Sequence, residues 1–403
     1  MQQGNENRIR GDLDGRQPGG TSRRRFISGA LAAGVLALGA WRRVCAAGLP
    51  IAHGIDHAFL GLVPFDNEPS LRQDEMIGAE LDARLFTNLS MLDEQKLVVP
   101  ADKFYIRTGA SKLLPPAESW TVRIQRRKET ELLTAEQLES KSLPQGACLM
   151  ECAGNTRATG FGLMSAANWN GIPMSRLLER VKQLPKQILI SGFDQYASTS
   201  MSSVAGASWI FTPDQLYAND SFLATHINGA RLTADHGGPF RLVVPGFYGC
   251  ASIKWVKEIT LLDDGDAEST SQMLEYALRT GQRGLPSLAR EYAPPHVEPA
   301  AMPIRVERWR IGSELHYQVI GIAWGGREVE TEWEIQFNPD AEYAQIRSVA
   351  ALPGKYTWAL WKHEWKPIAP GKYSIKLRPR DPAVPARRAR SGHYMRSVTI
   401  SES

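Results

Sequence analysis

The chain has 403 residues, of which 43% are hydrophobic and 22% are charged, so it is long and apolar enough to build two packed cores. Its formal net charge is +4 at pH 7, and the basic residues form no stripe, zinc-finger or RNP pattern. These features indicate a globular protein and disfavour a nucleic-acid-binding one. The mild positive charge is suited to attracting small anions or an acidic protein partner.

Residues 1–47 resemble a twin-arginine export signal. A polar leader ends in Arg23-Arg24-Arg25-Phe26, an apolar stretch over 29–40 follows, and Cys45-Ala46-Ala47 offers a cleavage site. The apolar stretch is too short for a confident membrane span, so we expect a periplasmic protein without a stable span once the signal is removed. Arg42 and Arg43 interrupt the pattern, and an uncleaved anchor stays an alternative.

Residues 48–280 mix short strands, short helices and many loops, which predicts an α+β domain. Residues 121–125 alternate as a strand, and a short helix is expected after Thr134, with Gln137 completing a capping box. A longer amphipathic helix is predicted over 173–183, and a buried strand over 241–244. No βαβ rhythm or glycine-rich phosphate loop is present in the sequence, so a Rossmann or P-loop domain is disfavoured.

The composition changes over 281–303 to glycine, proline and charge, which predicts a linker. Residues 304–403 then show short alternating runs separated by turn residues, at 316–324, 331–337, 356–361 and 372–377. Such runs predict an immunoglobulin-like β-sandwich. Because this region carries no obvious chemistry, dimerisation is its expected role.

Cys152 is the first candidate for chemistry. The apolar run 148–151 predicts a strand that would deliver this thiol to a loop. A thiolate suits molybdenum, copper, zinc or iron–sulfur centres, but zinc and iron–sulfur sites usually need several closely spaced Cys or His, and the chain has four Cys and no C-x-x-C. Three cysteines follow the predicted signal, so at least one has no partner within the chain. A buried structural cysteine remains the alternative.

Two arginines could act together with that thiol. Arg107 ends the predicted strand 104–107, and Arg157 lies five residues after Cys152 in the same loop. Two guanidinium groups close to one thiolate would form an oxyanion pocket, since Arg donates in a planar fork and keeps its proton. The alternative for either arginine taken alone is a solvated surface charge.

A second group of basic residues is suited to a phosphate. His236 and Arg241 flank a turn before a buried strand, and Lys254 enters another short strand. A phosphate-bearing cofactor would use such a Lys, Arg and His together, although a single His in a turn is usually structural. Serine hydrolase chemistry is disfavoured because the sequence has no G-x-S-x-G elbow, and His pairs at helical spacing are also missing from it.

Taken in order, five motifs resemble the sulfite oxidase family of molybdenum enzymes: Phe104-Tyr-Ile-Arg107, Cys152-Ala-Gly-Asn-Thr-Arg157, Asn168-Trp-Asn-Gly171, Asp235-His-Gly-Gly-Pro-Phe-Arg241 and Ile253-Lys-Trp255. The resemblance implies a molybdopterin-binding domain followed by the sandwich, with Cys152 as the protein ligand of molybdenum. It implies catalytic roles for Cys152, Arg107 and Arg157. The cofactor contacts that it implies are Tyr105, Ile106, Arg107, Thr108, Cys152, Asp194, His236, Arg241, Ser252, Ile253 and Lys254.

The same resemblance implies oxidation of sulfite to sulfate. Since the sequence contains no Cys-x-x-Cys-His haem motif, electrons would pass to a separate acceptor such as a c-type cytochrome. A homodimer, or a complex with a haem subunit, is the expected assembly.

The chain departs from the family pattern in its substrate pocket. Where family members carry a pocket Tyr, this sequence has Ala205-Gly206-Ala207-Ser208, and Tyr196 is a possible substitute. A further pocket arginine from the C-terminal region could be any of Arg387, Arg388 or Arg390. Three alternatives therefore stay open: another sulfur oxyanion as substrate, reduction of an S- or N-oxide, and a non-enzymatic binding protein that has lost its cofactor.

Overall fold

The computed structural model describes residues 57–68, 72–78, 83–108, 114–196, 207–338 and 342–401. Asp56–Ser403 forms one compact unit. The predicted export signal at 1–47 lies outside the described residues, as do the backbone at 197–206 and the side chain of Tyr196. Within the described part, none of the helices has the length and apolar character needed to cross a membrane.

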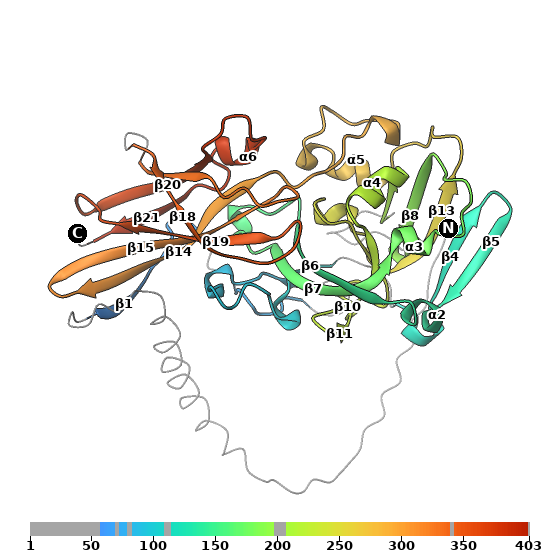
Figure 1. Cartoon of the computed structure of the whole chain (residues 1–403), viewed down its shortest axis with the longest axis horizontal. Coiled ribbons are helices and arrows are strands. Elements are labelled where there is room, and N and C mark those ends of the chain that lie inside the picture. The colour runs from blue at the N-terminus through green and yellow to red at the C-terminus, as the bar shows by residue number, and fades with distance from the viewer. Residues whose placement is uncertain are drawn as a thin grey trace, which may run out of the picture. The chain divides into compact units, whose positions relative to one another are not determined.

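The N-terminal half contains two five-stranded sheets (Figure 1). In the first, only β4 and β13 pair in parallel, and the order is β5 (Glu129–Thr134), β4 (Thr121–Arg126), β13 (Val256–Leu262), β8 (Gln187–Gly192) and β9 (Ser208–Phe211). In the second, β12 (Arg241–Val243) pairs with β10, and the main order is β11 (Ala230–Arg231), β10 (Phe222–Ile227), β7 (Met164–Pro173) and β6 (Leu143–Glu151). A separate short ladder joins β2 (Arg84–Leu85) to β3 (Ile106–Arg107).

Four short α-helices accompany these strands in the described residues: α2 (Ala135–Glu139), α3 (Met174–Leu177), α4 (Pro213–Ala218) and α5 (Ser271–Tyr276). A fifth, α6 (Arg387–Arg390), lies with the C-terminal strands β14 (Ala300–Ile311) and β20 (Gly371–Pro379). The predicted cap of α2 is confirmed. The Gln137 N–H donates to Thr134 Oγ1 at 3.3 Å, and the Thr134 N–H donates to Gln137 Oε1 at 2.9 Å.

The helix predicted over 173–183 is wrong in its length, because α3 ends at Leu177. After it, the Glu179 N–H bonds to Arg176 O and the Val181 N–H bonds to Leu178 O, which are turn contacts between residues three apart. The apolar face was predicted correctly, because Met174, Leu177 and Leu178 are buried. Burial of that face therefore needs only one helical turn, and the chain then turns toward β8.

The C-terminal strands form the predicted β-sandwich, which confirms the α+β class with a sandwich at the C-terminal end. One sheet has the order β1 (His57–Val63), β14 (Ala300–Ile311), β15 (Glu314–Trp324), β19 (Trp358–Trp365) and β18 (Arg347–Ala351). The other has the order β17 (Ala344–Gln345), β16 (Trp333–Phe337), β20 (Gly371–Pro379) and β21 (Arg396–Ile400). The participation of β1 was not expected from the sequence, and the domain limits at 280 and 304 stay predictions.

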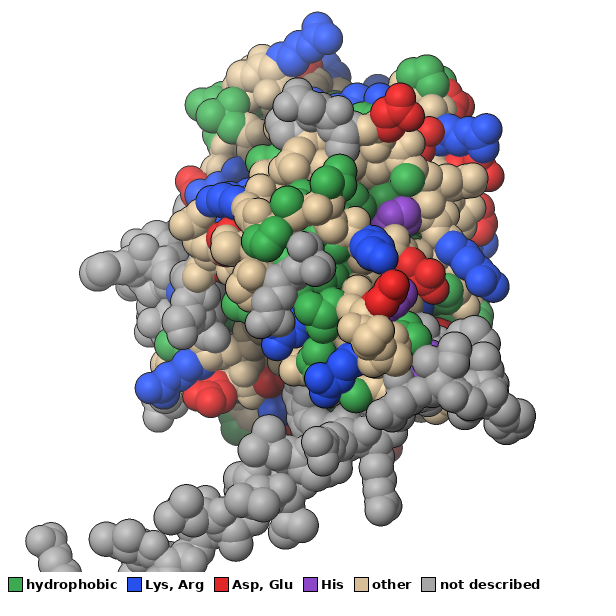
Figure 2. All heavy atoms as spheres, turned by 90° about the vertical axis from the view of Figure 1, so that its left-hand side faces the viewer, with side chains coloured by type: hydrophobic (Ala, Val, Ile, Leu, Met, Phe, Trp, Pro, Cys, Tyr) green, Lys and Arg blue, Asp and Glu red, His purple; other side chains and the backbone are tan. Residues whose placement is uncertain are grey.

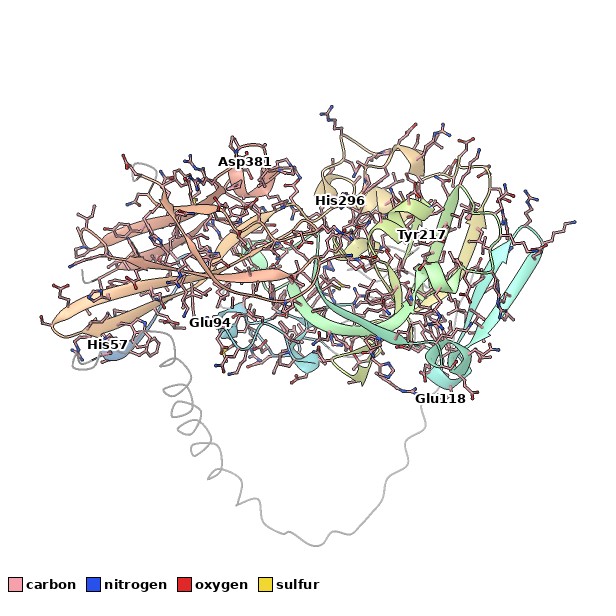
Figure 3. All side chains as sticks on the ribbon, viewed as in Figure 1. His57, Glu94, Glu118, Tyr217, His296 and Asp381 are labelled. Carbon is pink, nitrogen blue, oxygen red and sulfur yellow. The ribbon has the colours of Figure 1, made fainter. Side chains whose placement is uncertain are left out.

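The sandwich packs against the N-terminal half through a shared apolar core that includes Trp324, Trp358 and Leu360. The Trp358 indole N–H donates to Leu97 O at 2.9 Å, and Glu94, labelled in Figure 3, accepts from Lys362 Nζ at 2.6 Å. Through these contacts, side chains of the sandwich can contribute to a site in the N-terminal half. Figure 2 shows acidic and basic side chains interspersed on the face at the sandwich end.

Candidate active site

Cys152 follows directly after β6, at the start of a tight turn. Its N–H bonds to Leu163 O at 2.9 Å, and its carbonyl accepts from the Asn155 N–H at 2.9 Å. The Gly154 N–H donates to Cys152 Sγ at 3.4 Å. Burial raises the pKa of the Cys152 thiol, while the Gly154 N–H and the charge of Arg107 act against that rise. A thiolate at this position therefore needs further positive charge, as a bound metal ion would supply.

A cavity opens beside this thiol, and most of the predicted site residues line it. Its lining residues are Tyr105, Arg107, Thr108, Cys152, Asp194, Ala207, Arg241, Gly249, Cys250, Ser252, Ile253, Lys254, Trp255, Gln272 and Tyr276. Segments far apart in the sequence are therefore brought together around Cys152. Ile106, Arg157 and His236 are not among the lining residues.

Lys254 lies half-buried at the cavity wall. Its Nζ donates to Thr108 Oγ1 at 2.8 Å and to the carbonyl oxygens of Arg107 at 3.1 Å and Asp235 at 2.5 Å. Burial and the nearby charge of Arg241 lower the pKa of Lys254 well below its usual range, although the carboxylates of Asp235 and Asp194 act against this shift. An anion such as a phosphate would oppose the shift further.

His236 is not a lining residue, but it is hydrogen-bonded to the lining residue Arg241. Its Nε2–H donates to Phe104 O at 3.1 Å, its Nδ1 lies 2.9 Å from Thr233 Oγ1, and burial lowers its pKa to about 4. Arg241 donates through Nη1 to His236 O at 3.2 Å and through Nη2 to Met150 Sδ at 2.8 Å. His236 is therefore neutral at pH 7, and it orients Arg241 through its backbone.

Two buried polar atoms of the lining residues have no hydrogen-bond partner in the described part of the chain. They are Arg241 Nε and Asp194 Oδ1, and burial raises the pKa of Asp194 to about 6. Unpaired buried donors and acceptors are costly and indicate a missing partner. The backbone of Gly237 also lies close to Lys254, since a Cβ there would be 2.8 Å from Lys254 Cγ. These features fit a polar, phosphorylated cofactor.

The side chains that could act as metal ligands also limit how a metal could be held. Among the described residues, no three His, Cys, Asp or Glu side chains gather into a group that could bind a metal ion. Cys148, Cys152 and Cys250 are all free and buried. The cavity lining offers the thiols of Cys152 and Cys250, so a metal there would take most of its ligands from the cofactor, as in molybdopterin.

The structure does not bring the two predicted substrate arginines together in the cavity lining. Arg107 ends β3 and lines the cavity, as the sequence predicts. The guanidinium of Arg157 instead donates to Met395 O at 2.5 Å, before β21 of the sandwich. Its catalytic role stays a prediction.

Of the three candidate C-terminal arginines, Arg388 reaches the turn that carries Cys152. Its Nη2 donates to Ala153 O at 3.3 Å and to Arg279 O at 2.6 Å, and its guanidinium lies over the ring of Tyr248. Arg388 Nη1 is buried without a partner in the described residues. Arg387 and Arg390 are bound elsewhere, to Glu298 and to backbone carbonyls around residue 382 respectively.

Sequence reasoning missed Cys250, Gln272 and Tyr276 in the cavity wall. Gln272 and Tyr276 lie four residues apart on α5, a spacing that places both on one helix face and that the sequence could have revealed. Burial and the nearby Cys152 raise the pKa of Tyr276 to about 12. Tyr276 thus provides a neutral hydroxyl at the cavity.

Comparisons with known proteins point to the same chemistry. Residues 110–270 match the model of the oxidoreductase molybdopterin binding domain. The chain is similar to sulfite oxidase of Gallus gallus, at 27% identity over 53% of this chain and 50% of the relative. It is also similar to nitrate reductase [NADPH] of Neurospora crassa, at 31% identity over 32% of this chain and 14% of the relative.

A solved structure shares the fold across most of the chain. The sulfane dehydrogenase SoxCD from Paracoccus pantotrophus matches with a TM-score of 0.58 and 16% identity, over 85% of this chain and 84% of that one. The mitochondrial sulfite oxidase of Drosophila melanogaster is 23% identical over 68% of this chain and 51% of its own length. The chain thus spans about half the length of these sulfite oxidases and a much smaller part of the nitrate reductases.

Proposed function

Because the chain belongs to the sulfite oxidase family of molybdopterin-dependent oxidoreductases, we propose that it oxidises sulfite to sulfate and passes the electrons to a separate acceptor. The family's oxidoreductase domain binds the molybdenum cofactor. The observation that carries the proposal is Cys152 in a cavity lined by the cationic side chains of Arg107, Arg241 and Lys254. Such a cavity suits an anionic cofactor and an anionic substrate together.

When bound, the cofactor supplies a redox-active molybdenum ion that accepts two electrons from the substrate. Cys152 holds the metal, and Lys254 and Arg241 neutralise the phosphate of the cofactor. Arg107 attracts the oxyanion from the cavity wall. Arg388 is not a lining residue, and it adds positive charge beside the turn through its bond to Ala153 O. Arg241 is buried, which strengthens its interaction with a charged ligand because the surrounding dielectric is low.

A steady-state assay tests the proposal. Chain loaded with molybdenum should reduce cytochrome c when sulfite is added, and chain from cells grown with tungstate should not. If molybdenum-loaded protein does not oxidise sulfite with cytochrome c or with a small-molecule acceptor, sulfite is the wrong substrate.

A second candidate function is the reduction of an oxyanion or of an S- or N-oxide at the same cofactor. Two observations favour keeping it: the similarity to nitrate reductases, and the presence of Tyr276, a residue that the sequence did not predict, in the cavity lining. Oxidation of a reduced viologen dye by nitrate or by a sulfoxide would support this candidate. Comparing kcat/KM for these compounds with that for sulfite decides between the two directions.

We extend the proposal to location and partners. The twin-arginine pattern at 1–47 supports export to the periplasm, with a c-type cytochrome as acceptor and the chain acting as a homodimer or beside a haem subunit. Fractionation of cells with intact and lysine-substituted Arg23-Arg24 tests export. Sedimentation of the purified chain with and without cytochrome c tests assembly.

A further inference from the structure

The segment 388–395 of the sandwich is hydrogen-bonded to the turn that carries Cys152. Arg388 donates to Ala153 O at 3.3 Å, and the Nε2–H of His393 donates to Asn155 O at 3.1 Å. In the opposite direction, Arg157 donates to Met395 O at 2.5 Å. These partners are separated by more than 230 residues in sequence, so each contact depends on the docking of the sandwich.

Glu151 takes part in the same contact between the turn and the sandwich. It is the last residue of β6 and the neighbour of Cys152. It is 0% exposed, and its carboxylate accepts from Trp324 Nε1 at 2.9 Å and from Tyr394 Oη at 3.2 Å, both in the sandwich. A third bond comes from Asn155 Nδ2 at 3.3 Å, within the same turn. One side chain thus ties the turn to itself and to two points of the sandwich.

The chemistry of the donors makes this carboxylate hard to replace. An indole N–H is a donor only, and the Tyr394 hydroxyl donates here, so both need an acceptor at the position of Glu151. A buried donor that loses its acceptor destabilises the folded state, because the donor stays removed from water without a hydrogen bond. An amide at this position has one oxygen and one N–H₂ group, so it cannot accept all three bonds that the carboxylate accepts.

We propose that Glu151 is a positioning residue that holds the Cys152 turn against the sandwich and so keeps the thiol directed at the cavity. This inference rests on the proposed function only in taking Cys152 as the metal ligand. It also gives the sandwich a role beside dimerisation, because the C-terminal strands then help to set the geometry of the metal site.

The test compares Glu151→Gln, Tyr394→Phe and the double variant in the full chain, purified without its cofactor. A matched control is Glu307→Gln, because Glu307 is also a buried carboxylate that accepts from a Trp indole, at 3.0 Å, and pairs with an arginine, at 2.7 Å, but lies in β14 away from the turn. Mass spectrometry follows iodoacetamide alkylation of Cys152 relative to Cys148 in the same chain.

Glu151→Gln should speed alkylation of Cys152 about 5- to 10-fold relative to Cys148, since one buried hydrogen bond of the turn is lost. Tyr394→Phe should give a smaller increase, and the double variant should fall short of the product of the two, because both changes act on the same group of hydrogen bonds around residue 151. Glu307→Gln should leave the ratio unchanged. Equal acceleration at Cys148 and Cys152, or an equal effect of Glu307→Gln, would show a general loss of stability and overturn the proposal.

The loaded enzyme gives a second readout. Glu151→Gln should lower the molybdenum retained per chain, and kcat per bound molybdenum, by about 10-fold, with a smaller change in KM. Full retention of molybdenum and kcat would contradict the positioning role. If the alkylation ratio responds as expected but no variant oxidises sulfite, the positioning role stands and the proposed substrate is wrong.

Discussion

The guanidinium of Arg388 donates to the carbonyl oxygen of Ala153 at 3.3 Å, so a sandwich residue lies beside the turn that begins with Cys152. Asp381, labelled in Figure 3, helps to form the bend before α6 that presents this arginine, because the Ala383 N–H donates to Asp381 Oδ1 at 2.7 Å. The site is therefore assembled from both parts of the described unit.

Replacing Arg388 tests its role in attracting the substrate. Arg388→Met should raise KM for the anionic substrate by about 10-fold or more, because a charge-assisted contact is lost, while kcat changes less. Steady-state kinetics measures both constants. Arg390→Met is the matched control, since Arg390 Nη2 binds Pro382 O on the surface, and it should leave KM unchanged. An unaltered KM in Arg388→Met would remove this arginine from substrate binding.

Replacing the thiol tests the metal ligand. Cys152→Ser should reduce turnover by more than about 100-fold. Replacing a residue that only supports a metal ligand already lowers metal affinity or activity by about 10- to 100-fold. Molybdenum content and sulfite-dependent turnover are measured on the same preparation. Cys148→Ser changes a cysteine that is also buried, four residues earlier on β6, and should retain turnover. Equal losses in both variants would mean that Cys152 is structural.

The ammonium of Lys254 should be needed to retain the cofactor. Lys254→Met removes the charge that faces the proposed phosphate, so the molybdenum and pterin recovered per chain should fall by about 10-fold or more. Fluorescence of the released pterin and metal analysis provide the measurement. Lys257→Met is the control, because Lys257 lies over the ring of Trp120 rather than in the cavity lining. Normal cofactor content in Lys254→Met would contradict the phosphate assignment.

His236 should make the cofactor-free protein less stable in mild acid. Burial lowers the pKa of His236 from 6.5 to about 4. Between about pH 4 and pH 6.5, the histidine is therefore protonated in the unfolded chain and neutral in the folded chain. Its contribution to stability is therefore complete above pH 6.5 and is lost as pH falls toward 4, by about 3 kcal/mol in total. Denaturant unfolding at several pH values should show this loss, and His236→Gln should lack it.

A second group titrates in the same range with the opposite sign. Burial raises the pKa of Asp194 to about 6, so the folded chain binds its proton more readily than the unfolded chain does. Only the difference between the wild type and His236→Gln therefore isolates the histidine. Parallel pH profiles for the two proteins would disprove the prediction.

Features set by neighbours in sequence could be predicted without the structure. The capping box at Thr134 and the alternation in β4 and β20 depend on residues a few positions apart, and the structure bears them out. The alternation expected over 316–324 is wrong, because β15 is buried continuously from Tyr317 to Trp324. The placement of Cys152 after a buried strand also followed from a local apolar run. The length of α3 did not, because local amphipathic spacing gives the buried face of a helix but not where tertiary packing ends it.

The sequence by itself determined the kind of chemistry: one thiol, a set of cationic residues and the order of motifs that accompany a molybdenum cofactor. Tertiary structure decided which of these groups share one cavity. It set Arg157 on Met395 O, brought Arg388 to Ala153 O, and placed Tyr276 in the wall. Such contacts join residues that are often hundreds of positions apart, and they form only when the sandwich buries its apolar surface against the N-terminal half, which no local pattern encodes.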